Sequence, residues 1–183
     1  MSYTPTIPEP PILDRMPGDP AKMQWYAAYT CARHEKSVSR QLQEKCIDCF
    51  LPLYRSVSRW KDRRKELTLP LFPGYVFVHI TSEDRLRVLQ IPSVAYFVSC
   101  SGRPATIEDS EMESLRQGVS LGACVEPHPY LKIGKRVRVK HGPLSGTGGV
   151  LVRRKDGYRV VLSIDLIQRS VAVEVGEADL ERL

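Results

Sequence analysis

One stretch decides the fold of this chain: Leu71-Phe72-Pro73-Gly74-Tyr75-Val76-Phe77-Val78. Nearly all of its side chains are bulky and apolar, which is typical of a buried strand. Successive side chains of a strand point to opposite faces, so Tyr75 and Phe77 share one face of the sheet. Val76 and Val78 share the other, so this valine set can build the core while the first set gives the sheet a second apolar face with an aromatic character. A sheet with two apolar faces must either carry helices on both sides or keep one side for a partner.

The composition is that of a folded protein with an anionic partner. The chain has 183 residues, of which 42% are hydrophobic and 26% charged, and its net charge of +6 favours nucleic acid. It contains no apolar stretch as long as a membrane span and no secretion signal. Its five cysteines follow no disulfide-framework pattern, which indicates a reducing compartment. We therefore expect a cytoplasmic monomer.

The first two thirds of the chain predict a disordered leader and an α+β domain. Six prolines within residues 1–22 argue against regular structure there. For the domain, residues 23–121, we expect a small sheet with helices packed on it. The expected elements are a strand over 25–29, a helix over 33–46, a strand over 50–54, a basic excursion over 55–66, a strand over 69–80, a helix after 81–84, a strand over 94–98 and a helix from 109 or 110.

The remainder predicts a linker and a small β-barrel. Pro127 and Pro129 stiffen residues 122–130, where the periodicity stops. In residues 131–183 valines alternate with polar residues in short runs, which are separated by turn residues such as Asp156-Gly157. Because β-branched residues favour strands, we expect a stable barrel here and no helical form.

These residues, in this order, resemble the NusG family of transcription factors. The N-terminal part resembles the family's NGN domain at Trp25-Tyr26, at Phe72-Pro73-Gly74-Tyr75-Val76-Phe77-Val78 and at Ile91-Pro92-Ser93-Val94. The C-terminal part resembles the KOW motif of an SH3-like barrel at Gly134-x-x-Val137-Arg138-Val139-x-x-Gly142-Pro143-Leu144, followed by Gly149-Val150. The resemblance covers roughly Met23 to Leu183.

The resemblance implies a protein that binds bacterial RNA polymerase. In the family, an aromatic depression of the NGN domain binds the clamp helices of the largest subunit, holds the clamp closed and suppresses pausing. The residues that match this depression are Tyr29, Phe72, Pro73, Tyr75 and Phe77. Aromatic residues are also typical of interface hot spots. The alternative is that Tyr75 and Phe77 only form core beneath a helix.

Within the family, the chain is most similar to specialised members such as RfaH and the UpxY-like antiterminators. The general factor has an Ile-Phe-Gly-Arg loop that engages the termination factor Rho. The matching stretch here, Ile164-Asp165-Leu166-Ile167-Gln168-Arg169, has an acid in place of the aromatic, which argues against Rho binding. The resemblance leaves a small-subunit ribosomal protein as a partner of Ile164, Leu166 and Ile167, whose alternative role is barrel core. RfaH's motif for the polymerase β gate loop is absent, and Arg85 and Arg87 lie near its place.

Basic residues in two segments are candidates for nucleic-acid contact, including the displaced non-template DNA strand. A basic segment with an aromatic can follow phosphates and stack a base, although a solvated hairpin tip explains the same charges. The candidates are Arg33, His34, Lys36 and Arg40 at the first helix, and Arg59, Trp60, Lys61, Arg63 and Arg64 in the excursion.

We expect no enzyme, cofactor or metal site. The motifs Cys31-x-x-His34 and Cys46-x-x-Cys49 bracket a helix of about twelve residues, and a rise of about 1.5 Å per residue separates them by about 18 Å. Zinc needs its ligands within about 2.3 Å. Three alternatives to a specialised antiterminator stay open: a general elongation factor that assists Rho, a KOW-containing ribosome-associated protein, and a redox or zinc protein.

Overall fold

The computed structural model describes residues 22–183 except 61–62, 121–124, 129, 131–133, 135, 142–143, 155–156, 177–178 and 183. The expected leader, apart from Lys22, therefore lies outside the described residues. For 57–60, 63–65, 153–154, 157–158 and 182 the backbone alone is described.

An antiparallel sheet forms the centre of the N-terminal domain. Its strands follow the order β2-β5-β1-β6, and β9 also pairs with β1. The bounds are β1 Gln24–Thr30, β2 Cys49–Phe50, β5 Tyr75–Ile80, β6 Val94–Phe97 and β9 Thr106–Ile107. The register places Tyr29 opposite both Tyr75 on β5 and Tyr96 on β6. The strand predicted from the opening stretch thus lies next to the central strand β1.

Two helices cover the aliphatic face of this sheet. These are α1, Glu35–Glu44, and the short α2, Arg85–Leu89. Val38 and Leu42 of α1 pack with Val76 and Val78 in one buried cluster. The prediction that the valine face of β5 builds a core is therefore confirmed. A third helix, α3 Asp109–Ser120, covers the aromatic face and buries Met112 and Leu115 there.

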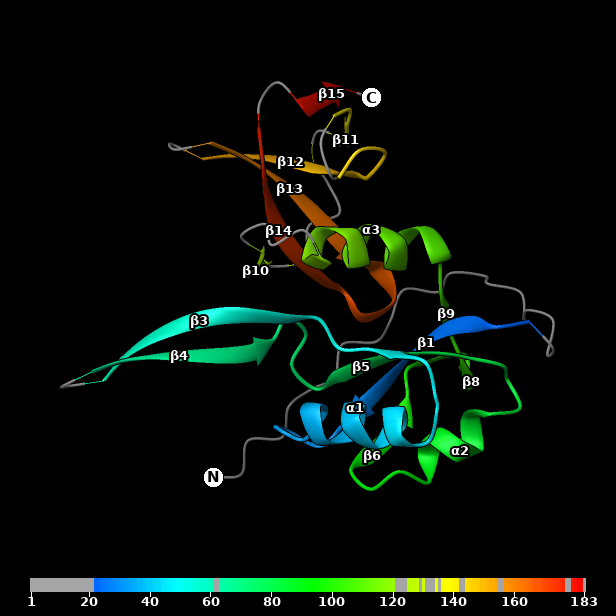
Figure 1. Cartoon of the computed structure of the whole chain (residues 1–183). Helices are drawn as coiled ribbons and strands as arrows, with labels where there is room; N and C mark the ends of the chain where they lie inside the picture. The colour runs from blue at the N-terminus through cyan, green and yellow to red at the C-terminus, as the bar shows by residue number, and fades with distance from the viewer. Residues whose placement is uncertain are drawn as a thin grey trace, which may run out of the picture.

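The basic excursion forms a long β-hairpin, β3 Leu53–Trp60 and β4 Arg63–Pro70, which extends from the body of the domain (Figure 1). The hairpin was one of the two explanations that the sequence left open for the basic excursion over 55–66, but the expected continuous strand over 69–80 was wrong. The chain leaves β4 at Pro70 and turns before β5. Gly74 has a φ of +85°, which a continuing strand cannot accommodate. Pro73, before it, has no N–H to donate to a ladder.

The C-terminal domain is a six-stranded antiparallel sheet, in agreement with the expected small β-rich domain. Its strands follow the order β10-β14-β13-β12-β11-β15. The bounds are β10 Val125–His128, β11 Arg136–Val139, β12 Gly148–Arg154, β13 Gly157–Ile164, η1 Asp165–Ile167, β14 Arg169–Val175 and β15 Leu180–Arg182. A separate two-stranded pair, β7 Ser99–Cys100 with β8 Arg103–Pro104, lies before α3 in the chain. Strand β10 lies within residues 122–130, expected as a linker, and pairs with β14. A linker segment with alternating burial can add an edge strand even with a proline in it.

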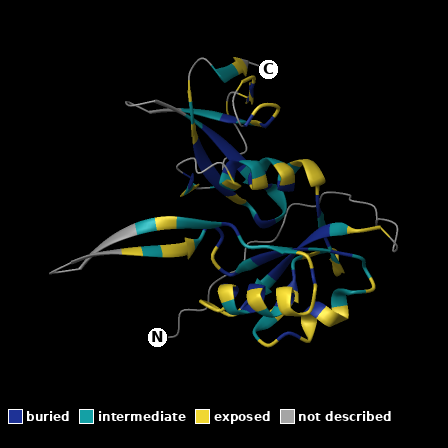
Figure 2. Cartoon of the chain, in the orientation of Figure 1, coloured by how far each residue is buried: buried dark blue, intermediate teal, exposed yellow. Residues whose placement is uncertain are grey.

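The two domains pack against each other through α3, which lies between the N-terminal sheet and strands β13 and β14 (Figure 1). A Cβ atom at Gly118 would lie 3.2 Å from Leu162 Cδ1 and 3.3 Å from Val173 Cγ2. The Thr147 hydroxyl donates to Gln117 Oε1 at 3.2 Å across the same contact. Buried residues of both domains consequently form one continuous core (Figure 2).

No helix in the described part of the chain is long and apolar enough to cross a membrane.

Candidate functional site

Three tyrosines from three strands form an aromatic cluster at one end of the N-terminal sheet. The Tyr29 ring stacks on Tyr96, with centroids 5.0 Å apart and planes at 18°. The rings of Tyr29 and Tyr75 meet edge to face, with centroids 5.3 Å apart and planes at 72°. Tyr96 is 42% exposed, while Tyr29 and Tyr75 are half-buried. We call these three residues the tyrosine cluster; it presents ring surface to solvent.

The other predicted docking residues lie differently. Phe72 and Phe77 are buried, at 1% and 0% exposure, and their rings meet edge to face with centroids 5.6 Å apart. Pro73 is exposed. The five predicted residues therefore divide into a buried pair and an accessible set. Sequence reasoning missed Tyr96, although the alternation of the strand over 94–98 would have placed it beside Tyr29 had the register been known.

The turn before β5 is held by a buried carboxylate at the start of α1. The Gly74 N–H donates to Glu35 Oε1 at 2.8 Å, and Glu35 is itself buried. A Cβ at Gly74 would lie 2.9 Å from Tyr29 Cε2, so glycine is needed for the ring to rest on the turn. This hydrogen bond holds the turn that carries Pro73 and leads into Tyr75, and so positions Pro73 beside the tyrosine cluster.

Replacing Glu35 by alanine is expected to lower the free energy of unfolding by about 1–3 kcal/mol, because the buried Gly74 N–H loses its acceptor. Glu35→Gln is the matched control, since its amide oxygen can still accept. Urea unfolding of both variants measures the difference. Equal losses for the two variants would show that the hydrogen bond is not what stabilises the turn.

Burial raises the pKa of two of these tyrosines, Tyr75 and Tyr96, away from physiological pH. It raises the pKa of Tyr75, and the Arg169 guanidinium, at the start of β14, acts in the opposite direction. Burial and the neighbouring Tyr29 hydroxyl both raise the pKa of Tyr96. The surface is therefore neutral at physiological pH and suits an apolar partner.

The predicted partner residues of the C-terminal domain lie in or against the core that the two domains share. Ile164 and Ile167 are buried, and Leu166 packs against them as a partly buried side chain. All three belong to the same core as Phe72 and Phe77. In this arrangement Phe72, Phe77, Ile164 and Ile167 are covered by the protein itself, whereas the tyrosine cluster and Pro73 remain accessible.

The predicted nucleic-acid residues of the first helix lie at its exposed start. Arg33 and His34 precede α1, and the Lys36 ammonium donates to the Thr68 carbonyl oxygen at 2.6 Å, which ties α1 to the hairpin. Arg40 forms an exposed ion pair with Glu44 at 3.8 Å, an arrangement that contributes little to stability. The hairpin candidates Arg59, Trp60, Lys61, Arg63 and Arg64 have side chains outside the described residues.

Within the described ranges no group of three or more His, Cys, Asp or Glu side chains is placed to hold a metal ion. Burial raises the pKa of Cys49, whose thiol donates to the Ser39 carbonyl oxygen at 3.6 Å. His79 stacks on Trp25 at 4.7 Å and lies 3.5 Å from an Asp48 oxygen, so its contacts are structural.

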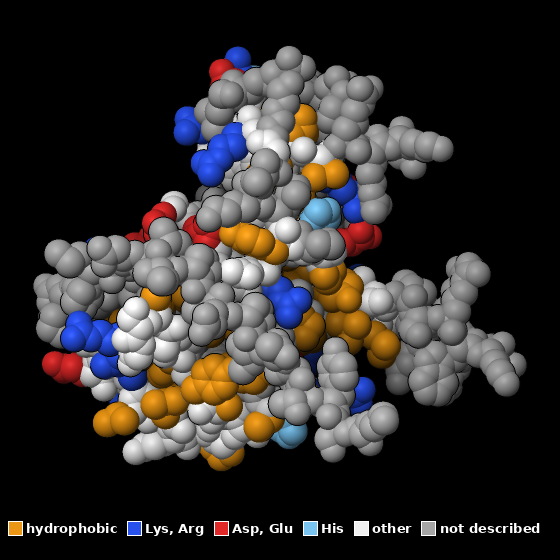
Figure 3. All heavy atoms as spheres, turned by 180° about the vertical axis from the view of Figure 1, so that it is seen from behind, with side chains coloured by type: hydrophobic (Ala, Val, Ile, Leu, Met, Phe, Trp, Pro, Cys, Tyr) orange, Lys and Arg blue, Asp and Glu red, His pale blue; other side chains and the backbone are white. Residues whose placement is uncertain are grey.

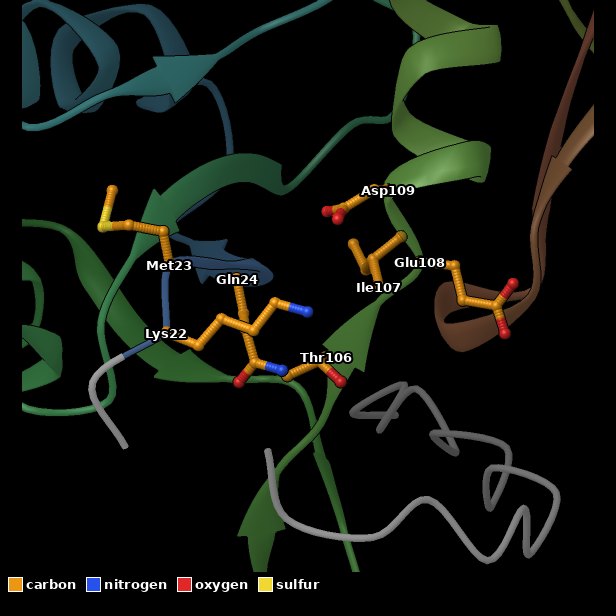
Figure 4. Close-up of a pocket in the computed structure, with 7 residues that line it drawn as sticks. All are labelled: Lys22, Met23, Gln24, Thr106, Ile107, Glu108 and Asp109. Carbon is orange, nitrogen blue, oxygen red and sulfur yellow. The ribbon is translucent and has the colours of Figure 1, made fainter. Parts of the chain in front are cut away.

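A shallow pocket of about 360 Å³ opens at the start of β1, and no aromatic side chain is among its lining residues (Figure 4). Its walls come from the first residue of β1 and the two residues before it, from β9, and from the junction of β9 with α3: Lys22, Met23, Gln24, Thr106, Ile107, Glu108 and Asp109. The mixed charges and open shape give it no recognisable ligand chemistry.

Comparisons with known proteins identify relatives of this chain. Residues 23–116 match the family model described as "Transcription termination factor nusG". The "Transcription termination/antitermination protein NusG" of Staphylococcus carnosus is 26% identical over 175 residues, which cover 87% of this chain and 96% of the relative. The protein of the same name from Helicobacter pylori is 21% identical over 174 residues, covering 88% and 99%.

Among solved structures, that described as "Domain interaction in Thermotoga maritima NusG" shares the fold, with a TM-score of 0.55 at 23% identity, and the match covers 90% of this chain and 99% of that one. The family model spans the N-terminal sheet and reaches into α3, so it includes every residue of the tyrosine cluster. This chain belongs to the NusG family of transcription termination and antitermination factors.

Proposed function

We propose that this protein is an antitermination factor that binds the clamp helices of bacterial RNA polymerase through its aromatic sheet face and suppresses pausing or termination. The observation that carries the proposal is the tyrosine cluster, three neutral aromatic rings that meet at an accessible edge of the sheet. Tyrosine supplies large, rigid contact area with a polar tip, and it is enriched among the residues that dominate binding energy. Pro73 extends this surface on the turn before β5.

The proposed binding mode requires the C-terminal domain to move. Phe72 and Phe77 are buried in a core to which Ile164 and Ile167 of the C-terminal domain also belong. A partner helix can reach Phe72 and Phe77 only after the contacts that bury them open, including those of α3, whereas the tyrosine cluster and Pro73 are accessible without this movement. Opening also frees the side chains that we propose for a small-subunit ribosomal protein. The two partner surfaces therefore become available together, and binding at one favours binding at the other.

The specialised role rests on the loop between β13 and β14. Asp165 lies where the general factor has an aromatic, and its carboxylate accepts a hydrogen bond from the Tyr130 hydroxyl at 3.2 Å. A carboxylate at this place is a poor substitute for an aromatic in an apolar contact. We therefore propose that Rho is not a partner. We also propose a cytoplasmic monomer whose exposed α1 residues, beginning at Arg33, face the non-template DNA strand.

The test is polymerase binding by single alanine variants. Tyr96→Ala and Tyr75→Ala are each expected to weaken binding to core RNA polymerase by roughly 30-fold, the loss typical of a hot spot of about 2 kcal/mol. Leu86→Ala is the matched control, because Leu86 is 69% exposed on α2 at the opposite face of the sheet. Titration of fluorescently labelled full-length chain with polymerase measures the affinities. Unchanged binding by both tyrosine variants would refute the proposed surface.

A second candidate is a general factor that assists Rho. The relatives from Staphylococcus carnosus and Helicobacter pylori, whose names include termination, match along almost their whole length. In vitro transcription on a Rho-dependent template separates the two functions. The antitermination proposal expects no stimulation of Rho by this chain, and a gain in Rho-dependent product would favour the second candidate.

A further inference from the structure

A row of three exposed cations follows the outer face of β11 in the C-terminal domain. Arg136 and Arg138 lie on this strand and Lys140 follows directly, all three exposed. Val137 and Val139 alternate with them and are buried at 0% and 1% exposure. Because side chains two residues apart share a face, the three cations form a line with a step of about 6.7 Å. Figure 3 shows Lys and Arg side chains gathered on this domain.

The backbone that carries the row is fixed. The buried valines pack into the interdomain core. The Val139 N–H donates to the Thr147 carbonyl at 2.9 Å, and the Lys140 N–H donates to the Asp179 carbonyl at 2.6 Å. The Ser145 hydroxyl donates to the Lys140 carbonyl at 2.8 Å. The charges are thus presented on a rigid strand, which lowers the entropy lost when they meet a partner.

The row carries uncompensated charge. Among the described residues no ion pair is formed by Arg136, Arg138 or Lys140, whereas Arg159 on β13 is paired with Glu126 at 2.7 Å and Glu174 at 2.6 Å. On β12 the residue opposite Arg138 is Gly148, which has no side chain.

Across the other edge of β11, Glu181 on β15 lies opposite Arg138. It is the acidic neighbour at this register position and reduces the charge of the row without pairing with it. Replacing Glu181 by glutamine should therefore increase the net positive charge of the row, which is the opposite of removing one of its cations.

We propose that this row binds consecutive phosphates of a single nucleic-acid strand. Alternate residues on a nearly straight strand repeat at a distance close to that between neighbouring phosphates of an extended strand. The row contains no aromatic residue for stacking a base, so the contact is to the backbone and independent of sequence. The site is on β11, apart from the α1 and hairpin residues considered above, and the inference does not rest on the proposed polymerase contact.

The experiment compares two triple variants of the full chain that lose the same charge. The first replaces Arg136, Arg138 and Lys140 by alanine; the second replaces the exposed Lys22, Lys45 and Arg103. Fluorescence anisotropy with a twelve-nucleotide oligouridine and with oligothymidine is measured from 50 to 200 mM salt. Loss of three phosphate contacts is expected to reduce the slope of log affinity against log salt by about 2, at about 0.7 for each contact. The second variant should retain most of the slope, and Glu181→Gln should bind more tightly than the unmodified chain.

The RNA and DNA probes identify the source of the strand. Tighter binding of oligouridine points to the transcript, and equal binding points to any exposed single strand. Equal slopes for the two triple variants would overturn the proposal, as would tighter binding of a duplex of the same length. Circular dichroism confirms folding of each variant, and polymerase titration of the same variants, expected to be unchanged, reports separately on the proposed function.

Discussion

Replacing Phe77 by alanine is expected to lower the free energy of unfolding by about 3–5 kcal/mol. The side chain is fully buried on β5, between Ala27 of β1 and Phe50 of β2, and its ring meets Phe72 edge to face. Truncation removes the buried ring and leaves a cavity that the sheet cannot close, because its backbone positions are fixed by ladder hydrogen bonds. Urea unfolding followed by circular dichroism measures the loss.

Tyr96→Ala is the control for this prediction. Tyr96 lies on the same sheet but is 42% exposed, so its loss is expected to cost less than about 1 kcal/mol of stability. A loss below about 1.5 kcal/mol for Phe77→Ala would mean that the aromatic face of β5 is not core. The contrast also decides which residues can test docking: a polymerase-binding defect in Phe77→Ala or Phe72→Ala reports unfolding as readily as a lost contact.

Placing phenylalanine at Gly118 is expected to separate the two domains. Even a Cβ atom at this position would lie 3.2 Å from Leu162 Cδ1 and 3.3 Å from Val173 Cγ2, so a ring has no room in the contact. Overpacking of this kind costs about 1–3 kcal/mol, which shifts the equilibrium toward open molecules by roughly 5- to 150-fold. Helix α3 itself is not weakened, because phenylalanine has a better helix propensity than glycine. Small-angle scattering should show a larger radius of gyration, and polymerase affinity should rise.

Gly118→Ala serves as the comparison. Its single methyl group meets the ends of flexible side chains, which can shift by a few tenths of an ångström, while the helix gains about 1 kcal/mol. This variant should remain closed with unchanged polymerase affinity. If Gly118→Phe opens the molecule without raising the affinity, the C-terminal domain does not mask the polymerase-binding surface.

Local periodicity correctly predicted much of the fold. The alternation in β5 identified a valine face as core, and that face packs on α1 and α2. The three-residue and four-residue spacing after Asp109 predicted α3, whose Met112 and Leu115 are buried. The wrong predictions of secondary structure have one cause: the local sequence of a strand does not specify the strand with which it pairs. The basic excursion is regular because β3 and β4 pair along their whole length, and Val125–His128 is a strand because β14 accepts it.

Which side chains share a face could be predicted from the sequence, because the direction of a side chain follows from the backbone geometry of its own element. The sequence thereby identified the aromatic face of β5 and the alternating valines of the C-terminal sheet. Only the tertiary structure decided that Tyr29, Tyr75 and Tyr96 meet, since their contact depends on the register of β1 with two distant strands. It also decided that Phe72 and Phe77 are covered, because their burial comes from α3 and from a core shared with another domain.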